Sequence, residues 1–328
     1  MIIDCHGHYT TAPAALDRFR AARLAAGGER VSPPSISDDE IRESVEGKQL
    51  AHMDERGIDL TLFSPKASAM GHHVPGPAAA AEWARVSNDL VHRVVALFPR
   101  RFAAVCQLPQ TPDGSLDEPV RELRRCVAEL GFVGCNLNPD PSGGFWSGRP
   151  LTDPAWYPLY EALVELDVPA MVHVSASCNP NAHTLGAHYL NADTAAFVQL
   201  MGSDLFTRFP GLRLVVPHGG GAVPYHWGRF RGLAERYGWP DPSALLSNVW
   251  FDTCVYHEPG VRLLLDVIGA DNVLFASEML GAVRGVDPNT GGAWDDTRRY
   301  VERLDLTPED RQKVYAGNAR RVYPQLPY

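Results

Sequence analysis

The sequence predicts an α/β protein with the fold of a (β/α)8 TIM barrel. Short runs of β-branched residues alternate with longer amphipathic stretches, as expected when parallel strands are joined by crossover helices. There are eight such runs, which is the number that a closed barrel requires. An open, doubly wound sheet would usually carry a glycine-rich phosphate loop after its first strand, and no GxGxxG follows residues 2–5. The barrel is therefore the favoured architecture.

The expected strands are short hydrophobic runs. They lie at residues 2–5, 58–64, 103–108, 132–137, 169–174, 212–217, 249–254 and 273–276. Apolar residues recur at helical spacing over 116–130, and Gly131 stands where a C-cap belongs. Asp153 and Thr307 each precede a proline, a pattern typical of an N-cap, so we expect helices over 155–166 and from residue 308 onward.

Composition and charge exclude several classes of protein. Of the 328 residues, 45% are hydrophobic and 21% charged, and the mean hydropathy is -0.18, which excludes wholesale disorder. The net charge of -9 opposes general attraction to nucleic acid or to anionic membranes. No linker or repeat divides the chain, so we expect a single barrel domain over 1–328 with a C-terminal helical extension. No apolar run has membrane-spanning length and no signal-peptide pattern opens the chain, so we expect a cytoplasmic protein.

Two histidines, His6 and His8, follow the first strand at a spacing of two. The two-residue period of an extended chain turns both imidazoles to the same face, which in a barrel can be the interior. An HxH pair alone is equally compatible with two polar residues at the end of a strand.

Three more candidate ligands follow later strands at corresponding places. His173 ends the fifth strand, His218 ends the sixth and Glu278 lies just past the eighth. All five side chains should converge on the C-terminal mouth of the barrel, where active sites of this fold form. Each alone would be interpreted as a hydrogen-bonded histidine or a solvated carboxylate. Five together predict a metal site, because imidazole and carboxylate are metal ligands.

These residues resemble the amidohydrolase superfamily, in the branch that includes the aminocarboxymuconate-semialdehyde and γ-resorcylate decarboxylases. The resemblance extends from D-C-H-G-H at 4–8 to G-N-A-R at 317–320. It implies a TIM barrel of the metal-dependent hydrolase type, with one divalent metal and a catalytic acid or base after strand six. Carried over residue by residue, the metal ligands are His6, His8, His173 and Glu278, and His218 lies near the metal-bound water.

The fourth strand favours one metal over two. Two-metal members of the superfamily use a modified Lys or a Glu after this strand, whereas this chain has Asn136 and Asn138. Nitrogen and carboxylate ligands with an open position suit Zn²⁺, with Mn²⁺ or Fe²⁺ as alternatives.

The acid after strand eight departs from the usual pattern of the family, in which it is Asp. Here Ser277-Glu278 lies within FASEMLGAVRGVDPNTG. This segment, together with AHYLNADT at 187–194, resembles the 4-oxalomesaconate hydratases of protocatechuate and gallate 4,5-cleavage catabolism. The resemblance implies addition of water to 4-oxalomesaconate, giving 4-carboxy-4-hydroxy-2-oxoadipate, with Glu278 and His218 as catalytic groups.

A tricarboxylate substrate needs cations, which an acidic protein must place locally. Arg284 can clamp one carboxylate in bidentate fashion, and its place beside the site motif favours this role over that of a solvated loop cation. Lys66 can meet another carboxylate or be a solvated loop cation. Tyr189 is a candidate proton donor or carboxylate partner, or an interfacial aromatic residue. The six cysteines form no CxxC pair and are expected to be reduced and mostly in the core, and Cys178 is interpreted as a small buried thiol.

Two other functions stay open. The first is a metal-dependent decarboxylase of an aromatic or muconate-type acid, or a related hydrolase. The second is a non-catalytic barrel that uses zinc for structure or senses a metabolite, which would require that Glu278 and His218 have no catalytic role. By analogy with metabolic enzymes of this size, we expect a homo-oligomer that binds a small molecule.

Overall fold

The computed structural model describes residues 1–26, 29 and 31–327. Within this part of the chain, eight parallel strands form one curled sheet and are ordered β1 to β8 as in the sequence. The strands are β1 (Ile3–Tyr9), β2 (Leu60–Pro65), β3 (Phe102–Gln107), β4 (Gly134–Leu137), β5 (Ala170–Val172), β6 (Leu214–Val216), β7 (Val249–Asp252) and β8 (Val273–Leu274). Each predicted strand overlaps an observed one, which confirms the predicted order of elements.

Two backbone hydrogen bonds join the first strand to the chain that follows the last. The amide of Cys5 donates to the carbonyl of Phe275, and the amide of Glu278 donates to the carbonyl of His6, both at 2.9 Å. The sheet thereby curls on itself in the manner of a TIM barrel. The second bond also places Glu278 beside His6.

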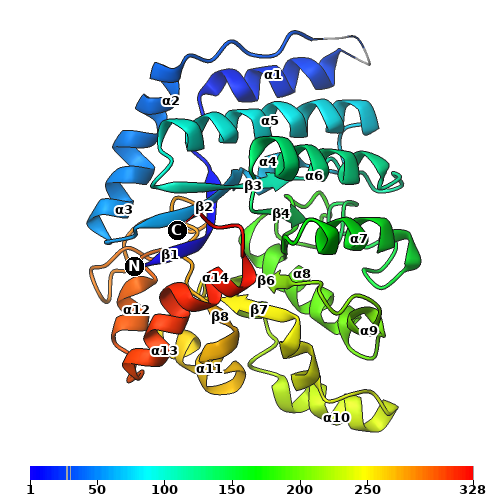
Figure 1. The fold of residues 1–328 in the computed structure, drawn as a ribbon, viewed down its shortest axis with the longest axis vertical. Helices are drawn as coiled ribbons and strands as arrows, with labels where there is room; N and C mark the ends of the chain where they lie inside the picture. The colour runs from blue at the N-terminus through cyan, green and yellow to red at the C-terminus, as the bar shows by residue number, and fades with distance from the viewer. Residues whose placement is uncertain (27–28, 30, 328) are drawn as a thin grey trace.

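Helices connect the strands and surround the sheet (Figure 1). They are α1 (Ala14–Ala25), α2 (Asp38–Val45), α3 (Ala51–Glu55), α4 (Ala67–Met70), α5 (Pro77–Leu97), α6 (Asp117–Leu130), α7 (Tyr157–Glu165), α8 (Gly186–Leu200), α9 (Leu205–Arg208), α10 (Trp227–Tyr237), α11 (Glu258–Ile268), α12 (Arg298–Glu302), α13 (Pro308–Gln312) and α14 (Asn318–Val322). Among the described residues, no helix combines the length and the apolar composition needed to cross a bilayer.

The predicted helix ends are largely present. Gly131 ends α6 with a φ of 71°, a left-handed conformation that glycine adopts without strain. The Thr307 hydroxyl accepts a hydrogen bond from the amide of Asp310 at 3.0 Å and opens α13. Asp153 acts as an N-cap, as expected, and its carboxylate accepts a hydrogen bond from the amide of Ala155 at 2.8 Å. The element that it opens, however, is a 3₁₀ turn. The α-helix therefore begins later than predicted, at Tyr157.

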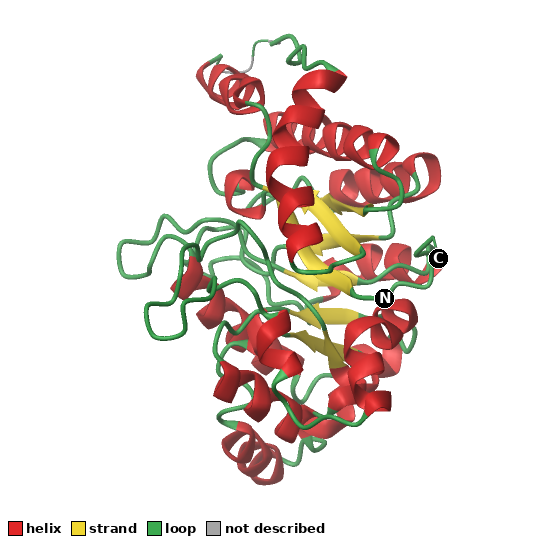
Figure 2. Ribbon diagram, turned by 90° about the vertical axis from the view of Figure 1, so that its left-hand side faces the viewer, coloured by secondary structure: helices red, strands yellow, loops and turns green. Residues whose placement is uncertain are grey.

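Apolar side chains fill the inside of the barrel at the end where the strands begin. Ile3, Cys5 and Met171 belong to this inner cluster, and Val322 and Tyr323 from the C-terminal segment join it. A larger cluster lies between the sheet and the surrounding helices. Both termini lie at this end of the sheet, and long loops project from the opposite end (Figure 2). The polar residues that follow the strands are thus left at the loop end.

Candidate active site

Four side chains from three parts of the sheet converge at the mouth of the barrel. His6 and His8 lie on β1, His173 directly follows β5, and Glu278 lies after β8. One ligand atom from each of the four lies within 4.8 Å of all the others, and all four side chains are buried. The structure therefore brings together the residues that the sequence suggested as metal ligands.

The two histidines of β1 face the interior because the strand is irregular. Ile3 and Cys5 pack inside the barrel, so strict alternation would turn His6 and His8 outward. The pairing of β1 with β2 shifts register between Asp4 and Gly7, which changes the phase of the alternation. As a result, both imidazoles point into the site.

Each of the three imidazoles has its Nδ1 atom hydrogen-bonded to a fixed acceptor. His6 Nδ1 lies 2.8 Å from Asp252 Oδ2, and His173 Nδ1 lies 2.7 Å from the carbonyl oxygen of Val174. His8 Nδ1 lies 2.7 Å from the Ser64 hydroxyl, which itself donates to backbone carbonyls. With Nδ1–H donating in each ring, the Nε2 atom carries a free lone pair.

The free nitrogens face one another at short distances. His8 Nε2 lies 3.1 Å from His6 Nε2 and 3.3 Å from His173 Nε2. Burial, together with the neighbouring imidazoles, holds the pKa of His8 and of His173 well below the ordinary value, which favours the neutral rings. Lone pairs at these distances repel one another unless a cation lies among them. Three imidazoles and one carboxylate are a donor set that a divalent metal fits.

His218 lies beside this group but has a different environment. Its Nδ1 atom is 2.9 Å from Asp193 Oδ2, and its Nε2 atom is 3.9 Å from Glu278 Oε2. The Nε2 atom is buried and has no hydrogen-bond partner among the described residues. Burial acts to lower the pKa of His218, but the carboxylates of Asp193, Glu278 and Asp252 together outweigh it and raise this pKa to about 9. The ring therefore favours its protonated form.

The carboxylate of Glu278 accepts a hydrogen bond from Tyr256. The Tyr256 hydroxyl lies 2.7 Å from Oε2 of Glu278. Both residues have positive φ values, 57° for Tyr256 and 48° for Glu278, as does His218 at 50°. Side-chain-bearing residues adopt this left-handed region at a cost, which commonly marks a functional site.

A cavity of about 250 Å³ opens next to the four convergent side chains. Lys66 and Arg284 both line it, together with Tyr189 and Glu278. Both cations are exposed, and the guanidinium of Arg284 donates to the carbonyls of its own loop at Gly281 and Leu280. Both positive charges thus border the cavity.

Tyr189 and Cys178 differ in how they relate to the site. Tyr189 is buried and stacks on His218, with ring centroids 5.5 Å apart and an angle of 24° between the planes. Burial raises the pKa of its hydroxyl, and so does the Glu278 carboxylate. Cys178 is exposed, so the prediction of a buried thiol was wrong, whereas the other five cysteines are buried and free. Cys178 lies on the loop after β5, where its thiol contacts the carbonyl of Gly143 and its side chain is exposed to solvent.

The sequence interpretation missed the residues that hold the predicted ones in place. Asp252 stood near the end of the predicted strand at 249–254, which was a usable signal, because the ends of other predicted strands carried candidate ligands. Ser64 ended the predicted strand at 58–64, which was a signal of the same kind. Asp193 was visible only as part of the NADT segment, and nothing in the local sequence pointed to Tyr256. Asn136, which the sequence removed from the ligand set, donates to the Ser64 hydroxyl at 3.1 Å.

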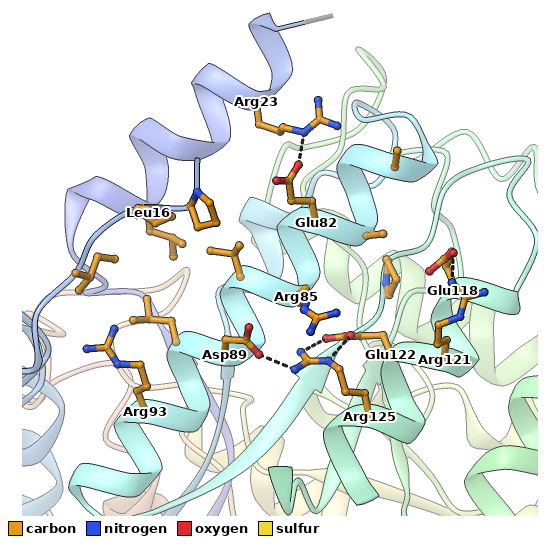
Figure 3. A pocket seen from close by; sticks show the side chains of 18 residues that line it. Leu16, Arg23, Glu82, Arg85, Asp89, Arg93, Glu118, Arg121, Glu122 and Arg125 are labelled. Carbon is orange, nitrogen blue, oxygen red and sulfur yellow. Dashed lines mark hydrogen bonds and ion pairs between the residues drawn. The ribbon is translucent and has the colours of Figure 1, made fainter. Parts of the chain in front are cut away.

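A larger hollow lies away from this chemistry, between α1, α5 and α6 (Figure 3). Its volume is about 820 Å³, and its described lining contains arginines and acids but neither histidine nor cysteine. Most of these charges neutralise one another through the ion pairs Arg23–Glu82, Arg121–Glu118, Arg125–Asp89 and Arg125–Glu122. The smaller cavity beside Glu278 is therefore the candidate site, despite its size.

Comparison with known proteins places the chain in a family. Residues 3–325 match the family model for amidohydrolases. The chain belongs to this family. The superfamily resemblance seen in the sequence is thereby confirmed.

Two relatives in this family are similar over almost their whole length. A 2-keto-4-carboxy-3-hexenedioate hydratase of Sphingobium sp. is 58% identical over 330 residues, covering 99% of this chain and 97% of that protein. The crystal structure of a 4-oxalomesaconate hydratase from Rhodopseudomonas palustris matches with a TM-score of 0.92 at 53% identity, covering 99% of this chain and 96% of that one.

Decarboxylases are more distant relatives. A γ-resorcylate decarboxylase of Polaromonas sp. is 29% identical over 312 residues, covering 85% of this chain and 87% of that protein. A dihydroxybenzoic acid decarboxylase structure from Polaromonas sp., which contains bound manganese, has a TM-score of 0.70 at 22% identity and covers 100% of this chain and 98% of that one. This last likeness shows a shared fold.

Proposed function

We propose that the protein hydrates 4-oxalomesaconate, the substrate that the Sphingobium relative's name gives as 2-keto-4-carboxy-3-hexenedioate, in protocatechuate and gallate catabolism. The observation that carries this proposal is the placement of Glu278, whose carboxylate joins three convergent imidazoles beside a cavity lined by Lys66 and Arg284. The hydratase from Sphingobium sp., at 58% identity, supports the same substrate.

The reaction adds one water molecule across a carbon–carbon double bond. The adjacent ketone makes the β-carbon electrophilic, so the oxygen of water bonds to that carbon while the π electrons move toward the α-carbon. The α-carbon takes up a proton, and water gives one up, so no net proton is consumed. The product is 4-carboxy-4-hydroxy-2-oxoadipate. The site must therefore supply one proton acceptor and one proton donor.

Glu278 and His218 are the proposed acid–base pair. Glu278 is placed to accept the proton of the attacking water. His218, which is held by Asp193 and has an unpartnered Nε2 atom 3.9 Å from Glu278, is placed to exchange a proton with the same group of atoms. Tyr189, stacked on His218, is a further candidate donor or carboxylate partner.

The proposed metal ligands are His6, His8, His173 and Glu278. When bound there, a divalent metal would act as a Lewis acid toward water or the keto acid. Zn²⁺ suits the nitrogen-rich donor set best, and the manganese in the related decarboxylase structure makes Mn²⁺ the first alternative, with Fe²⁺ next.

Lys66 and Arg284 are the proposed carboxylate-binding residues. They line the same cavity from different loops, after β2 and after β8, so they can hold two carboxylates of one substrate at separate points. Two separate cations support a substrate with more than one carboxylate, such as the proposed tricarboxylate.

An assay of the purified protein with 2-keto-4-carboxy-3-hexenedioate and with γ-resorcylate tests this function. Hydration removes the absorbance of the conjugated enone and releases no carbon dioxide, whereas decarboxylation releases it. We expect turnover of the first compound only, with metal content measured on the same preparation. Release of carbon dioxide from γ-resorcylate without hydration of the enone would favour the decarboxylase function instead.

A further inference from the structure

We propose that Tyr256 and Gly281 are positioning residues that hold the Glu278 carboxylate in one orientation. Tyr256 acts through its hydrogen bond and Gly281 through the absence of a side chain. The inference deepens the proposed function, since it concerns how Glu278 is prepared for its part in hydration.

Tyr256 contacts the oxygen of Glu278 that lies nearer to His218. Its hydroxyl donates to Oε2 at 2.7 Å, and the same Oε2 is 3.9 Å from His218 Nε2. Tyr256 is not among the residues that line the cavity, so it acts through Glu278 and not by contact with substrate. The hydrogen bond therefore keeps Oε2 directed at His218.

The backbone around this pair is arranged to make the contact. Tyr256 and Glu278 follow neighbouring strands, β7 and β8, and each has a left-handed φ, of 57° and 48°. Such conformations persist only when the surrounding structure enforces them. The strain at both ends of one hydrogen bond indicates that the relative position of the two side chains matters.

Gly281 leaves the space into which the Glu278 side chain folds. A Cβ atom at position 281 would lie 2.8 Å from both Cγ and Cδ of Glu278 and 2.6 Å from its carbonyl oxygen. Carbon atoms in ordinary contact lie about 3.5–4.0 Å apart, so any side chain here must displace the carboxylate. The amide of Gly281 also donates to the Glu278 carbonyl at 2.9 Å, which closes a tight turn.

The first test is Tyr256→Phe, which removes the hydroxyl and keeps the ring. We expect kcat to fall about 10- to 100-fold while KM stays within about twofold and the metal stoichiometry is unchanged, because Tyr256 does not touch substrate. Tyr225→Phe is the matched control, since Tyr225 is 75% exposed. Melting temperature measured on each variant separates this effect from a loss of folded protein.

The second test is Gly281→Ala, with Gly186→Ala as its control. Gly186 is the first residue of α8, and a Cβ there would meet, among the described residues, only the Cβ of Ala282, at 4.0 Å. We expect Gly281→Ala to lower kcat and to weaken metal binding in a chelator competition, and Gly186→Ala to do neither. Reconstitution with Co²⁺ gives a readout that needs no substrate. The visible cobalt bands should change in Tyr256→Phe and Gly281→Ala and stay the same in the two controls.

The outcomes distinguish this inference from the proposed function. If the parent protein hydrates the enone but Tyr256→Phe retains its kcat and its cobalt spectrum, the inference is wrong. The same holds if Gly186→Ala is as impaired as Gly281→Ala. If the cobalt bands change as expected while the parent does not hydrate the enone, the positioning role stands and the proposed function fails. Should Gly281→Ala not fold, Tyr256→Phe alone decides.

Discussion

His6 on β1 and Asp252 on β7 are joined by a hydrogen bond of 2.8 Å between Nδ1 and Oδ2. Asp252 is the last residue of β7, and its other oxygen accepts from the amides of Gly219 and Cys254 at 3.2 and 3.0 Å. These contacts hold the carboxylate, and the carboxylate holds the His6 ring with Nε2 toward the other imidazoles.

Asp252→Ala should therefore weaken metal binding without removing a ligand. Outer partners of ligating histidines typically contribute about 10- to 100-fold in metal affinity, and we expect a loss of that size. The measurement is the dissociation constant from competition with a chromogenic chelator. Asp266→Asn, at an exposed position of α11, is the control and should bind metal like the parent.

Removal of the metal should abolish activity, and Zn²⁺ should restore it. Neutral imidazoles and one carboxylate form a site that a chelator can empty. His6→Ala should lose metal and stay folded, since the ligand lies at the mouth of the barrel, away from the helix-packed core. Full activity in protein shown to be metal-free would contradict the whole assignment, and unfolding of His6→Ala would indicate a structural metal.

Arg284→Met should act on substrate capture. Loss of a charge-assisted partner costs about 1.5–3 kcal/mol, so kcat/KM should fall about 10- to 100-fold or more, with metal content unchanged. Lys66→Met should act in the same direction. Lys48→Met removes one exposed positive charge away from the cavity and serves as the control. If either variant has the steady-state kinetics of the parent, the replaced residue is a solvated cation and does not bind substrate.

His218→Asn should lower kcat while the metal is retained. The substitution keeps a polar group beside Asp193 but removes the nitrogen that faces Glu278. General acid–base groups typically contribute about 10²- to 10⁴-fold, which sets the expected loss. Metal analysis of the purified variant is the deciding measurement, because loss of stoichiometric metal would make His218 a ligand.

Replacement of Glu278 by either Gln or Asp should lower kcat. Gln keeps the size and an acceptor oxygen but cannot take a proton, so Glu278→Gln should retain much of its metal and lose about 10²- to 10⁴-fold in kcat. Asp shortens the side chain by one methylene, and a displacement of about 1 Å can cost roughly 10²-fold. Metal content and kcat are measured together for both variants. An Asp variant as active as the parent would remove the most distinctive support for hydration.

Much of the architecture was predictable because its signals are local. Each strand was visible as a short hydrophobic run, and the C-cap Gly131 and the N-cap Thr307 marked helix ends correctly. The start of α7 was not predicted correctly, because an Asp-Pro pair such as Asp153-Pro154 can begin a 3₁₀ turn as well as an α-helix. Cys178 was misplaced because its exposure depends on where a loop leaves the surface.

The sequence by itself determined which residues follow the ends of the strands, and so which histidines and acid meet at one mouth. A barrel gathers the ends of all its strands, so order along the chain was sufficient for that conclusion. Only the tertiary structure decided how these groups are oriented. The phase of His6 and His8 depends on a register shift against β2, and the partners Asp252, Asp193 and Tyr256 approach from other elements. Hydrogen bonds between residues distant in the chain leave no periodic trace in the sequence, whereas the strands and helices that carry those residues do.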